Sequence, residues 1–196
     1  PYHEHTQTWS WWSSQCTTEA EFIEFWKFTI TYLRDVKGVH NFIYAISPQM
    51  DADYGNGTKS RLLHRWPGDD YVDFLGMDCY HYSNKQAFKS NLTAMSALSL
   101  EKMKPCGVTE TGPEGFDWTD YWTNHILACA KGSRVSMIVM WRNKYVGTNE
   151  NDRHFYSVYP GHPSEEDFRT FYKDETTFFS EDLPDMYSMP ENYEVR

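Results

Sequence analysis

The sequence predicts a parallel α/β fold of the (β/α)8, or TIM barrel, type, and three observations lead to this class. Predicted helices and strands alternate along the chain, which is typical of parallel βα units. The strands are continuous apolar runs, as expected where both faces of a sheet are covered. Several strands end in residues of the kind that form active sites at the carboxyl ends of barrel strands: Asp78, Tyr80, Glu110, Trp141 and Arg142.

The helices are predicted from capping signals and apolar spacing. Thr18 and Glu21 form a capping-box pattern at the start of an apolar helical repeat over 18–36, which Gly38 ends. Three further helices are predicted by the same periodicity, at 86–102, 119–130 and 165–172.

The strands are predicted from short apolar runs, which we expect to be buried at 41–47, 71–80, 105–109 and 135–141. Residues 49–70 are predicted as a loop with a short helical piece, and residues 1–4 as the stub of a preceding strand. A doubly wound nucleotide-binding sheet is disfavoured, because no G-x-G-x-x-G motif follows a strand. A barrel is therefore favoured, although four strands and a stub are fewer than eight.

Length, charge and hydropathy limit the class of ligand. The 196 residues suffice for one domain with a buried core, and the net charge is −10 with a pI near 5.2. No basic cluster could bind a phosphate backbone, so nucleic acid and anionic membrane are disfavoured as partners. No apolar run of 18 residues exists, which excludes a membrane span from the sequence. A neutral ligand fits this charge best.

Four widely spaced cysteines lack the C-x-x-C spacing of a structural zinc site: Cys16, Cys79, Cys106 and Cys129. We expect free and mostly buried thiols more than a disulfide, which leaves the cellular compartment open. The chain starts at Pro1 without a methionine or a signal-like segment. We therefore expect that the beginning of a longer protein is missing.

Glu4 and Glu110 are the strongest candidate catalytic pair. Each is predicted at a strand end beside small or aromatic residues, and two carboxylates that flank one bond are typical of glycoside hydrolysis. Nearby aromatic rings could stack on sugars. We expect Trp9 to contact ligand and Trp11 to lie in the core, whereas for Trp12 both interpretations remain open.

A metal-dependent hydrolase is the alternative suggested by His3 and His5, which share a face if they lie on a strand. Asp78 and His81 could complete such a site, but Glu110 would then be unexplained. We therefore predict neither a metal nor a cofactor. Serine catalysis is disfavoured, because no G-x-S-x-G motif occurs.

A set of motifs between residue 1 and about residue 163 resembles glycoside hydrolase family 26, whose most common activity is endo-β-1,4-mannanase. The motifs are, in order, His3-Glu4, Trp9-Ser10-Trp11-Trp12, Trp66-Pro67-Gly68-Asp69, Tyr71-Val72-Asp73, Gly76-Met77-Asp78-Cys79-Tyr80, Thr109-Glu110-Thr111-Gly112, Trp141-Arg142-Asn143 and Tyr159-Pro160-Gly161-His162. Six or more in the right order are a specific signal, whereas one alone would be weak.

The resemblance implies a retaining hydrolase with Glu4 as acid/base at the end of barrel strand 4 and Glu110 as nucleophile on strand 7. A raised pKa is expected for Glu4, while donors such as Tyr80 should keep Glu110 ionised. The residues implied or proposed to contact substrate are His3, Trp9, Trp12, Asp78, Tyr80, Trp141 and Arg142. A mannan-type polysaccharide is the implied partner, which places the protein in an extracellular, periplasmic or cell-surface location.

The resemblance also implies that residues 1–196 are the C-terminal portion of one catalytic barrel, from the end of strand 4 to helix 8. Residues 5–8 and Ser10 depart from the family pattern, which affects subsites more than chemistry. Lichenase or β-1,3-xylanase activity of the same family remains open, as does a non-catalytic carbohydrate-binding domain. The oligomeric state is not predicted.

The isolated 196-residue chain is expected to aggregate or to lack activity, because half a barrel exposes sheet edges and an unfilled core. Thermal melting and a mannan turnover assay test this. Clean two-state melting together with turnover by this chain alone would contradict it.

Overall fold

A computed structural model describes residues 2–81, 84–144 and 154–185. Pro1, where the predicted strand stub begins, and the end of the polar tail lie outside the described residues. The chain divides into two compact units: Pro1–Phe116 with Gly132–Ser157, and Asp117–Lys131 with Val158–Arg196.

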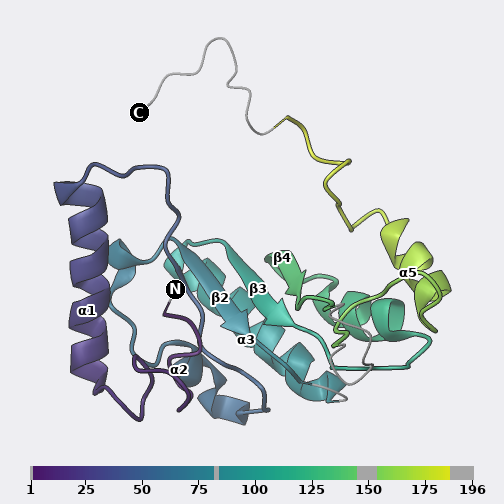
Figure 1. The fold of residues 1–196 in the computed structure, drawn as a ribbon, viewed down its shortest axis with the longest axis horizontal. Helices are drawn as coiled ribbons and strands as arrows, with labels where there is room; N and C mark the ends of the chain where they lie inside the picture. Colours follow the sequence, from purple (N-terminus) through teal and green to yellow (C-terminus); the bar gives the residue numbers. More distant parts are fainter. Residues whose placement is uncertain (1, 82–83, 145–153, 186–196) are drawn as a thin grey trace. The chain divides into compact units, whose positions relative to one another are not determined.

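One parallel sheet of four strands, counted over the described residues, forms the centre of the first unit (Figure 1). Its order is β1-β2-β3-β4, so each strand pairs with its neighbour in sequence. The strands are β1 (Ala45–Ile46), β2 (Phe74–Asp78), β3 (Cys106–Thr111) and β4 (Val135–Met140). This order, with helices in the connections, is that of consecutive βα units of a (β/α)8 barrel, and it confirms the predicted class. Within the described chain the barrel is not closed.

Local sequence signals correctly predict the helices of this unit. The Thr18 hydroxyl accepts the Glu21 N–H, and the Glu21 carboxylate accepts the Thr18 N–H, as the capping box requires. The short helical piece expected within 49–70 is also present. The elements are α1 (Glu19–Thr31), which continues as the π-helix η1 (Tyr32–Val36), then η2 (Gly55–Gly57), α2 (Thr58–Leu62), η3 (Asp69–Tyr71) and α3 (Lys85–Lys102).

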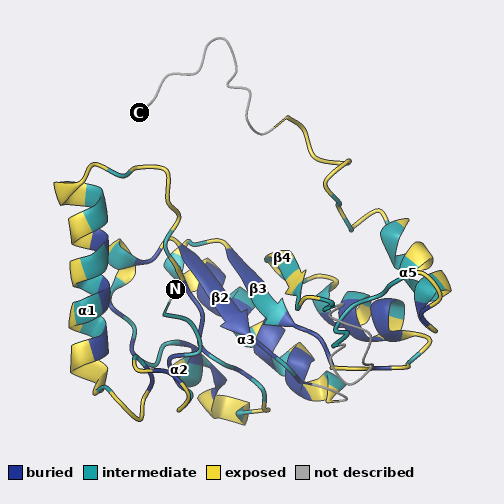
Figure 2. Ribbon diagram, in the orientation of Figure 1, coloured by how far each residue is buried: buried dark blue, intermediate teal, exposed yellow. Residues whose placement is uncertain are grey.

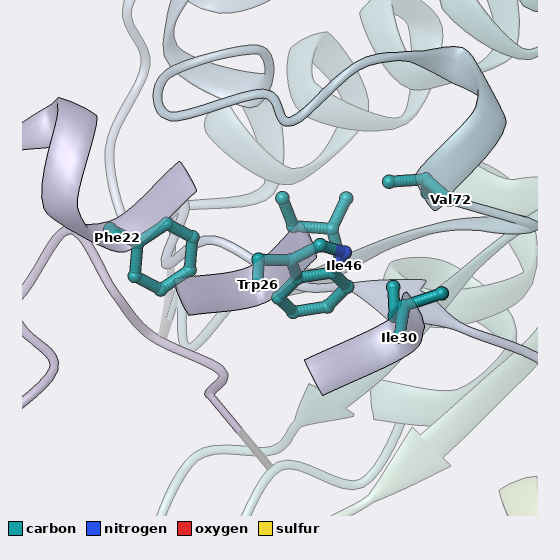
Figure 3. Packing of buried hydrophobic residues seen from close by; sticks show 5 residues of the cluster. All are labelled: Phe22, Trp26, Ile30, Ile46 and Val72. Atoms are coloured by element: carbon teal, nitrogen blue, oxygen red, sulfur yellow. The ribbon is translucent and has the colours of Figure 1, made fainter. Parts of the chain in front are cut away.

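An apolar cluster attaches α1 to the start of the sheet. Phe22, Trp26 and Ile30 repeat every four residues on α1, and their side chains pack around Ile46 of β1 and Val72 (Figure 3). All five are buried, and burying a side chain of this size contributes about 1.5–3 kcal/mol. The helix that follows the Glu4 region is therefore held against the strand after it.

The two outer strands differ from the prediction of fully buried runs. The predicted strand 41–47 is reduced to β1, and Phe42 and Ile43 before it are exposed. Met137 and Val139 of β4 are each 42% exposed, whereas β2 is buried along its whole length (Figure 2). β1 and β4 are the edges of this sheet, so each lacks the further neighbours that cover β2 and β3.

The predicted strand stub at residues 1–4 is not a strand over its described part. Glu4 donates its N–H to the Ser47 carbonyl at 2.8 Å, just beyond the end of β1. The chain then turns, since the Gln7 N–H returns to the Glu4 carbonyl. Glu4 has φ +47°, in the left-handed region that residues other than glycine seldom occupy. This sharp turn replaces the strand.

The second unit contains η4 (Tyr121–Leu127), α4 (Ala128–Ala130) and α5 (Glu165–Tyr172). The predicted helix 119–130 is thus mostly a π-helix, whereas 165–172 is confirmed. Asp167 of α5 accepts the N–H groups of Trp122 and Thr123, and so caps the start of η4. The Trp122 ring packs edge-on against Phe168.

The four cysteines all lie among the described residues and are free thiols, as expected. Cys16 is exposed and the other three are buried. In the part of the chain that the structure describes, no helix combines the length and the apolar character needed to cross a bilayer.

Replacing Gly76 of β2 by alanine is expected to destabilise the protein by about 1–3 kcal/mol, because the centre of the sheet has no room for a methyl group. An added Cβ would lie 2.9 Å from Thr109 Cγ2 and 3.0 Å from the Ile46 carbonyl oxygen. Urea unfolding of the full-length protein measures the effect. Gly57→Ala is the control, since nothing lies within 4 Å of its Cβ position and its φ is −84°. Equal midpoints for the two variants would contradict the expectation.

Candidate active site

Segments that are far apart in sequence meet at the carboxyl ends of β2 and β3. Asp78, the last residue of β2, pairs in register with Glu110 of β3. The register shifts between Met77 and Asp78, and both Thr109 and Glu110 approach Asp78 at this irregularity. Ser47 follows β1 directly, and the turn at His3 and Glu4 is bonded to it.

Asp78 is the most deeply buried charged group of this cluster, with none of its surface exposed. Its Oδ2 lies 2.7 Å from His3 Nδ1, and its Oδ1 accepts the Ser47 and Thr109 hydroxyls, each at 2.8 Å. A buried carboxylate is tolerated only when donors satisfy its oxygens. Here three donors from three segments do so.

Glu110 is partly buried and is held by two side chains that the sequence also singles out. Tyr80 donates its hydroxyl to Glu110 Oε2 at 2.8 Å, and His3 Nδ1 lies 3.5 Å from Oε1. The backbone is tied as well, because the Cys79 N–H donates to the Glu110 carbonyl. The predicted contact of Tyr80 with Glu110 is therefore present.

Glu4 follows His3 in the turn, and a donor reaches its carboxylate from the same loop. Trp9 donates its indole N–H to Glu4 Oε2 at 2.8 Å. Trp12 donates its indole N–H to the His3 carbonyl at 2.8 Å and packs against the apolar cluster of α1. Trp12 thereby supports the backbone of the turn, and its contact with substrate stays a prediction.

The pKa of each of the three titratable groups around Asp78 is raised, and the causes differ between the two carboxyl groups and the histidine. Burial, followed by the charge of Asp78, raises the pKa of Glu4, which agrees in direction with the expectation for an acid; Trp9 and His3 oppose the rise. Burial and Asp78 also raise the pKa of Glu110, although Tyr80 and His3 lower it. The hydrogen bond to Asp78 raises the pKa of His3. The imidazole is thus favoured in its protonated form between two carboxylates.

Two tryptophans of the N-terminal loop are exposed, not one. Trp9 and Trp11 are each 59% exposed, so the expectation of a core position for Trp11 is wrong. Its ring lies edge-on against Trp12 and Phe25, which places it outside the packed layer. The exposure of Trp9 leaves its ring face open to a ligand.

Trp141 and Arg142 follow β4 and lie next to the end of β3. The Trp141 N–H donates to the Thr111 carbonyl at 2.7 Å, directly beyond Glu110. Trp141 is partly buried, and the exposed Arg142 guanidinium lies 5.7 Å from the centre of its ring. The structure thus brings this pair to the same strand ends as the carboxylates, while their contact with substrate stays a prediction.

The metal alternative built on His3 and His5 does not fit the geometry. His5 is fully buried, packs its ring at a tilt against Phe22 and bonds to the His64 carbonyl, so it is not among the partners of His3. Among the described residues, one group has the spacing of metal ligands, with atoms within 4.8 Å of one another: His3, Asp78 and Glu110. These atoms form the hydrogen-bonded network described above, which explains their proximity.

Sequence reasoning missed three polar residues of the site: Ser47, Asp51 and Thr109. Ser47 and Thr109 bind Asp78, and Asp51 Oδ1 accepts the Tyr80 N–H at 2.6 Å. Ser47 ends a predicted strand and Thr109 precedes Glu110, so strand-end position was a usable signal for both. Asp51 lies in a loop, where no local pattern marks it.

These features define a class: a parallel α/β chain of the barrel type, with carboxylates clustered at the carboxyl ends of its strands. The profile of the glycosyl hydrolase family 26 matches residues 1–113, which is more than half of the chain. The chain belongs to glycosyl hydrolase family 26.

Individual relatives agree with this membership. A mannan endo-1,4-β-mannosidase of Bifidobacterium adolescentis is 28% identical over 189 residues, covering 87% of this chain and 18% of that relative. A GH26 β-mannanase from Bacteroides ovatus is 31% identical with a TM-score of 0.83, covering 100% of this chain and 55% of that one. GH26C from a Muricauda species is 30% identical with a TM-score of 0.85, over 98% and 52%. The chain spans about half the length of these two solved structures.

Asp78→Asn is expected to lower the pKa of His3, because an amide nitrogen opposite Nδ1 favours the neutral ring. With its pKa raised, His3 contributes stability that is fully present below the unfolded value of about 6.5 and is lost as pH rises through the higher folded value. The variant should lose this pH dependence. NMR titration of the histidine rings in the full-length protein, with His3→Gln for assignment, measures the pKa of His3.

Asp73→Asn provides the control for this titration, because the Asp73 carboxylate accepts the Tyr44 N–H and does not contact His3. It should leave the His3 titration in place. An unchanged His3 pKa in Asp78→Asn would contradict the expectation.

Proposed function

We propose that this chain is the C-terminal portion of the catalytic barrel of a retaining endo-acting β-1,4-mannanase. The single observation that supports this most is the arrangement of Glu4 and Glu110. The His3 imidazole lies 3.5 Å from the Glu110 carboxylate and its charge acts on Glu4, and each glutamate has its own hydrogen-bond donor.

In the proposed reaction Glu110 is the nucleophile and Glu4 the general acid. The Glu110 carboxylate attacks the anomeric carbon while Glu4 donates its proton to the leaving glycosidic oxygen, and an ester-linked glycosyl-enzyme forms. Glu4 then takes a proton from water, which attacks the same carbon and releases Glu110. This needs carboxyl groups about 5–5.5 Å apart.

The charges around the pair suit the acid role of Glu4, whereas the pKa of Glu110 is also raised on balance, by burial and then by Asp78, against the expectation for a nucleophile. A raised pKa keeps Glu4 protonated until the leaving oxygen needs the proton. Tyr80 and the imidazolium of His3 stabilise the Glu110 anion against its burial. Asp78 supports the acid role of Glu4 by raising its pKa. For Glu110 its direct charge raises the pKa as well, and its support is indirect, through the His3 imidazole that it holds and keeps charged.

Aromatic and cationic residues provide the proposed contacts with sugars. Trp141 would stack under the sugar that Glu110 attacks, with Arg142 beside it, and Trp9 would border the cleft. Trp12 has the weaker case for direct contact, because its indole N–H and much of its ring are already engaged.

The proposed substrate is a mannan or galactomannan. The Bifidobacterium and Bacteroides relatives carry mannanase names, and both align over most or all of this chain. A polymer of this size must be cleaved outside the cytoplasm, so we propose an extracellular, periplasmic or cell-surface location. A lichenase or β-1,3-xylanase of the same family is the alternative, and a substrate panel distinguishes the three.

Glu110→Gln is expected to abolish turnover by the full-length protein, and Glu4→Gln to lower it by about 10²–10⁴-fold, because one removes the nucleophile and the other the proton donor. Release of reducing ends from mannan, galactomannan, mixed-linkage glucan and β-1,3-xylan is the measurement. Exogenous azide should restore turnover of an activated aryl mannoside by Glu4→Ala but not by Glu110→Gln. Wild-type-level activity in either glutamine variant would refute the assigned roles.

A non-catalytic carbohydrate-binding domain predicts the opposite pattern. The wild-type protein would then bind mannan without any turnover, and both glutamine variants would bind equally. The buried Asp78 carboxylate and its hydrogen bond to His3 favour the enzyme, because a binding surface needs no buried carboxylate network.

Trp9→Phe is expected to move the basic limb of the kcat/KM profile to higher pH. The Trp9 N–H lowers the pKa of Glu4, so its removal raises that pKa and keeps the acid protonated to a higher pH. Rates on soluble galactomannan across pH measure this. Trp11→Phe is the matched control, since Trp11 is equally exposed and packs on Phe25. A basic limb that stays or moves to lower pH in Trp9→Phe would contradict the prediction.

A further inference from the structure

The loop after β1 continues the sheet beyond the end of the strand. Asp78 donates its N–H to the Pro48 carbonyl at 3.0 Å, and Met50 donates its N–H to the Asp78 carbonyl at 2.7 Å. Gln49 thereby pairs with Asp78 in a parallel bridge. Gln49 is therefore in register with the end of β2, and residues 50–52 follow directly beyond this bridge.

The buried side-chain amide of Asn91 on α3 fixes the backbone of this segment. Asn91 has no exposed surface, and its Nδ2 donates to the Met50 carbonyl at 2.7 Å and to the Ala52 carbonyl at 3.1 Å. The Cys79 thiol donates to the same Met50 carbonyl. The backbone on both sides of Asp51 is thus held by the helix and by β2, which leaves the Asp51 side chain with a defined direction.

That side chain points to the backbone of Tyr80. Asp51 Oδ1 accepts the Tyr80 N–H at 2.6 Å, and its Oδ2 contacts the side-chain amide of Gln49. Tyr80 lies just beyond β2, where the regular pairing of the strand no longer fixes its backbone. Its hydroxyl in turn donates to Glu110. A chain of contacts therefore runs from Asn91 through the loop to Asp51, Tyr80 and Glu110.

We propose that Asp51 is a positioning residue of the reaction, which aims the Tyr80 hydroxyl at Glu110 by holding the Tyr80 backbone. The proposal rests on the proposed function for its kinetic consequences, whereas the contact itself is independent of that function. Asp51 acts through Tyr80, and no contact of Asp51 with substrate is involved.

The charge environment of Asp51 supports a role as acceptor near neutral pH. Burial and the charges of Glu4 and Asp78 raise its pKa to about 6, while the Tyr80 N–H and Arg61 oppose the rise. Above that pH the ionised carboxylate is a stronger acceptor for the Tyr80 N–H than a neutral group would be.

The effect on Glu110 has a predictable sign. The Tyr80 hydroxyl lowers the pKa of Glu110, against the upward effects of burial, Asp78 and Glu4. If Tyr80 loses its backbone anchor, its hydroxyl no longer stays at hydrogen-bond distance, and the pKa of Glu110 rises. The acid limb of kcat/KM should then move to higher pH, and kcat should fall by about 10- to 100-fold because a group near the reacting atoms is misplaced.

The test compares Asp51→Ala with Asp51→Asn in the full-length protein. Both remove the charge, but asparagine keeps an oxygen that accepts the Tyr80 N–H, so the difference between them isolates the hydrogen bond. Asp51→Ala should raise the pKa of Glu110 and lower kcat, and Asp51→Asn should change both by clearly less, because its neutral oxygen still accepts the Tyr80 N–H, although less strongly. Asp51→Glu keeps the charge and displaces the acceptor, and it serves as the second variant if the alanine protein is unstable; it should behave like alanine.

A double-mutant comparison shows whether Asp51 acts through Tyr80. In a Tyr80→Phe background the phenol is absent, so Asp51→Ala should shift the Glu110 titration no further. Asp53→Ala is the control from the same loop, because the exposed Asp53 carboxylate bonds to the Gly55 N–H and not to the site. It should leave both kcat and the titration unchanged.

Carbon-13 NMR titration of glutamate carboxyls, with Glu110→Gln for assignment, reads the pKa of Glu110 without any turnover. An equal Glu110 pKa in Asp51→Ala, Asp51→Asn and wild type would overturn the inference, as would an additive shift in the Tyr80→Phe background. Failure of the wild-type protein to hydrolyse any of the four polysaccharides would instead overturn the proposed function, and the NMR comparison would still decide the role of Asp51.

Discussion

The buried carboxylate of Asp78 is the interaction on which the rest of the site depends. Its two oxygens take donors from the turn before α1, from the end of β1 and from β3, so one side chain joins three segments that each lie 31 to 75 residues from it in sequence. Burying a charge without partners would cost several kcal/mol, and this cost enforces the arrangement. The same carboxylate favours the charged form of His3, which lies 3.5 Å from Glu110 and whose charge lowers the pKa of Glu4.

Several carboxyl groups are crowded together around Asp78. The charge of Asp78 acts on Glu4, Asp51 and Glu110, and burial raises the pKa of all three. Each of these three has a neutral donor that limits the rise, respectively Trp9, the Tyr80 backbone and the Tyr80 hydroxyl. Because the donors differ, the two glutamates can be tuned separately within one small volume, as an acid and a nucleophile require.

Elements with strong local signals were predictable, and those that depend on neighbours were not. The capping box of Thr18 and the boundaries of α5 follow from side chains a few residues apart. The burial of β1 and β4 was mispredicted, because an apolar run indicates a strand but not whether further strands cover it. Trp11 was mispredicted for a similar reason, since spacing within a loop does not determine which ring faces the core.

The sequence by itself determined the chemistry that is available: Glu4 and Glu110 beside histidine and tryptophan, in an ordered set of motifs that identifies the family. Residue type and order are properties of the chain, so no coordinates are needed for them. The tertiary structure alone decided which donor each carboxylate receives, the direction of each pKa, and the link from Asp51 to Tyr80. Those properties depend on distances of about 3 Å between segments that are tens of residues apart, and only folding sets such distances.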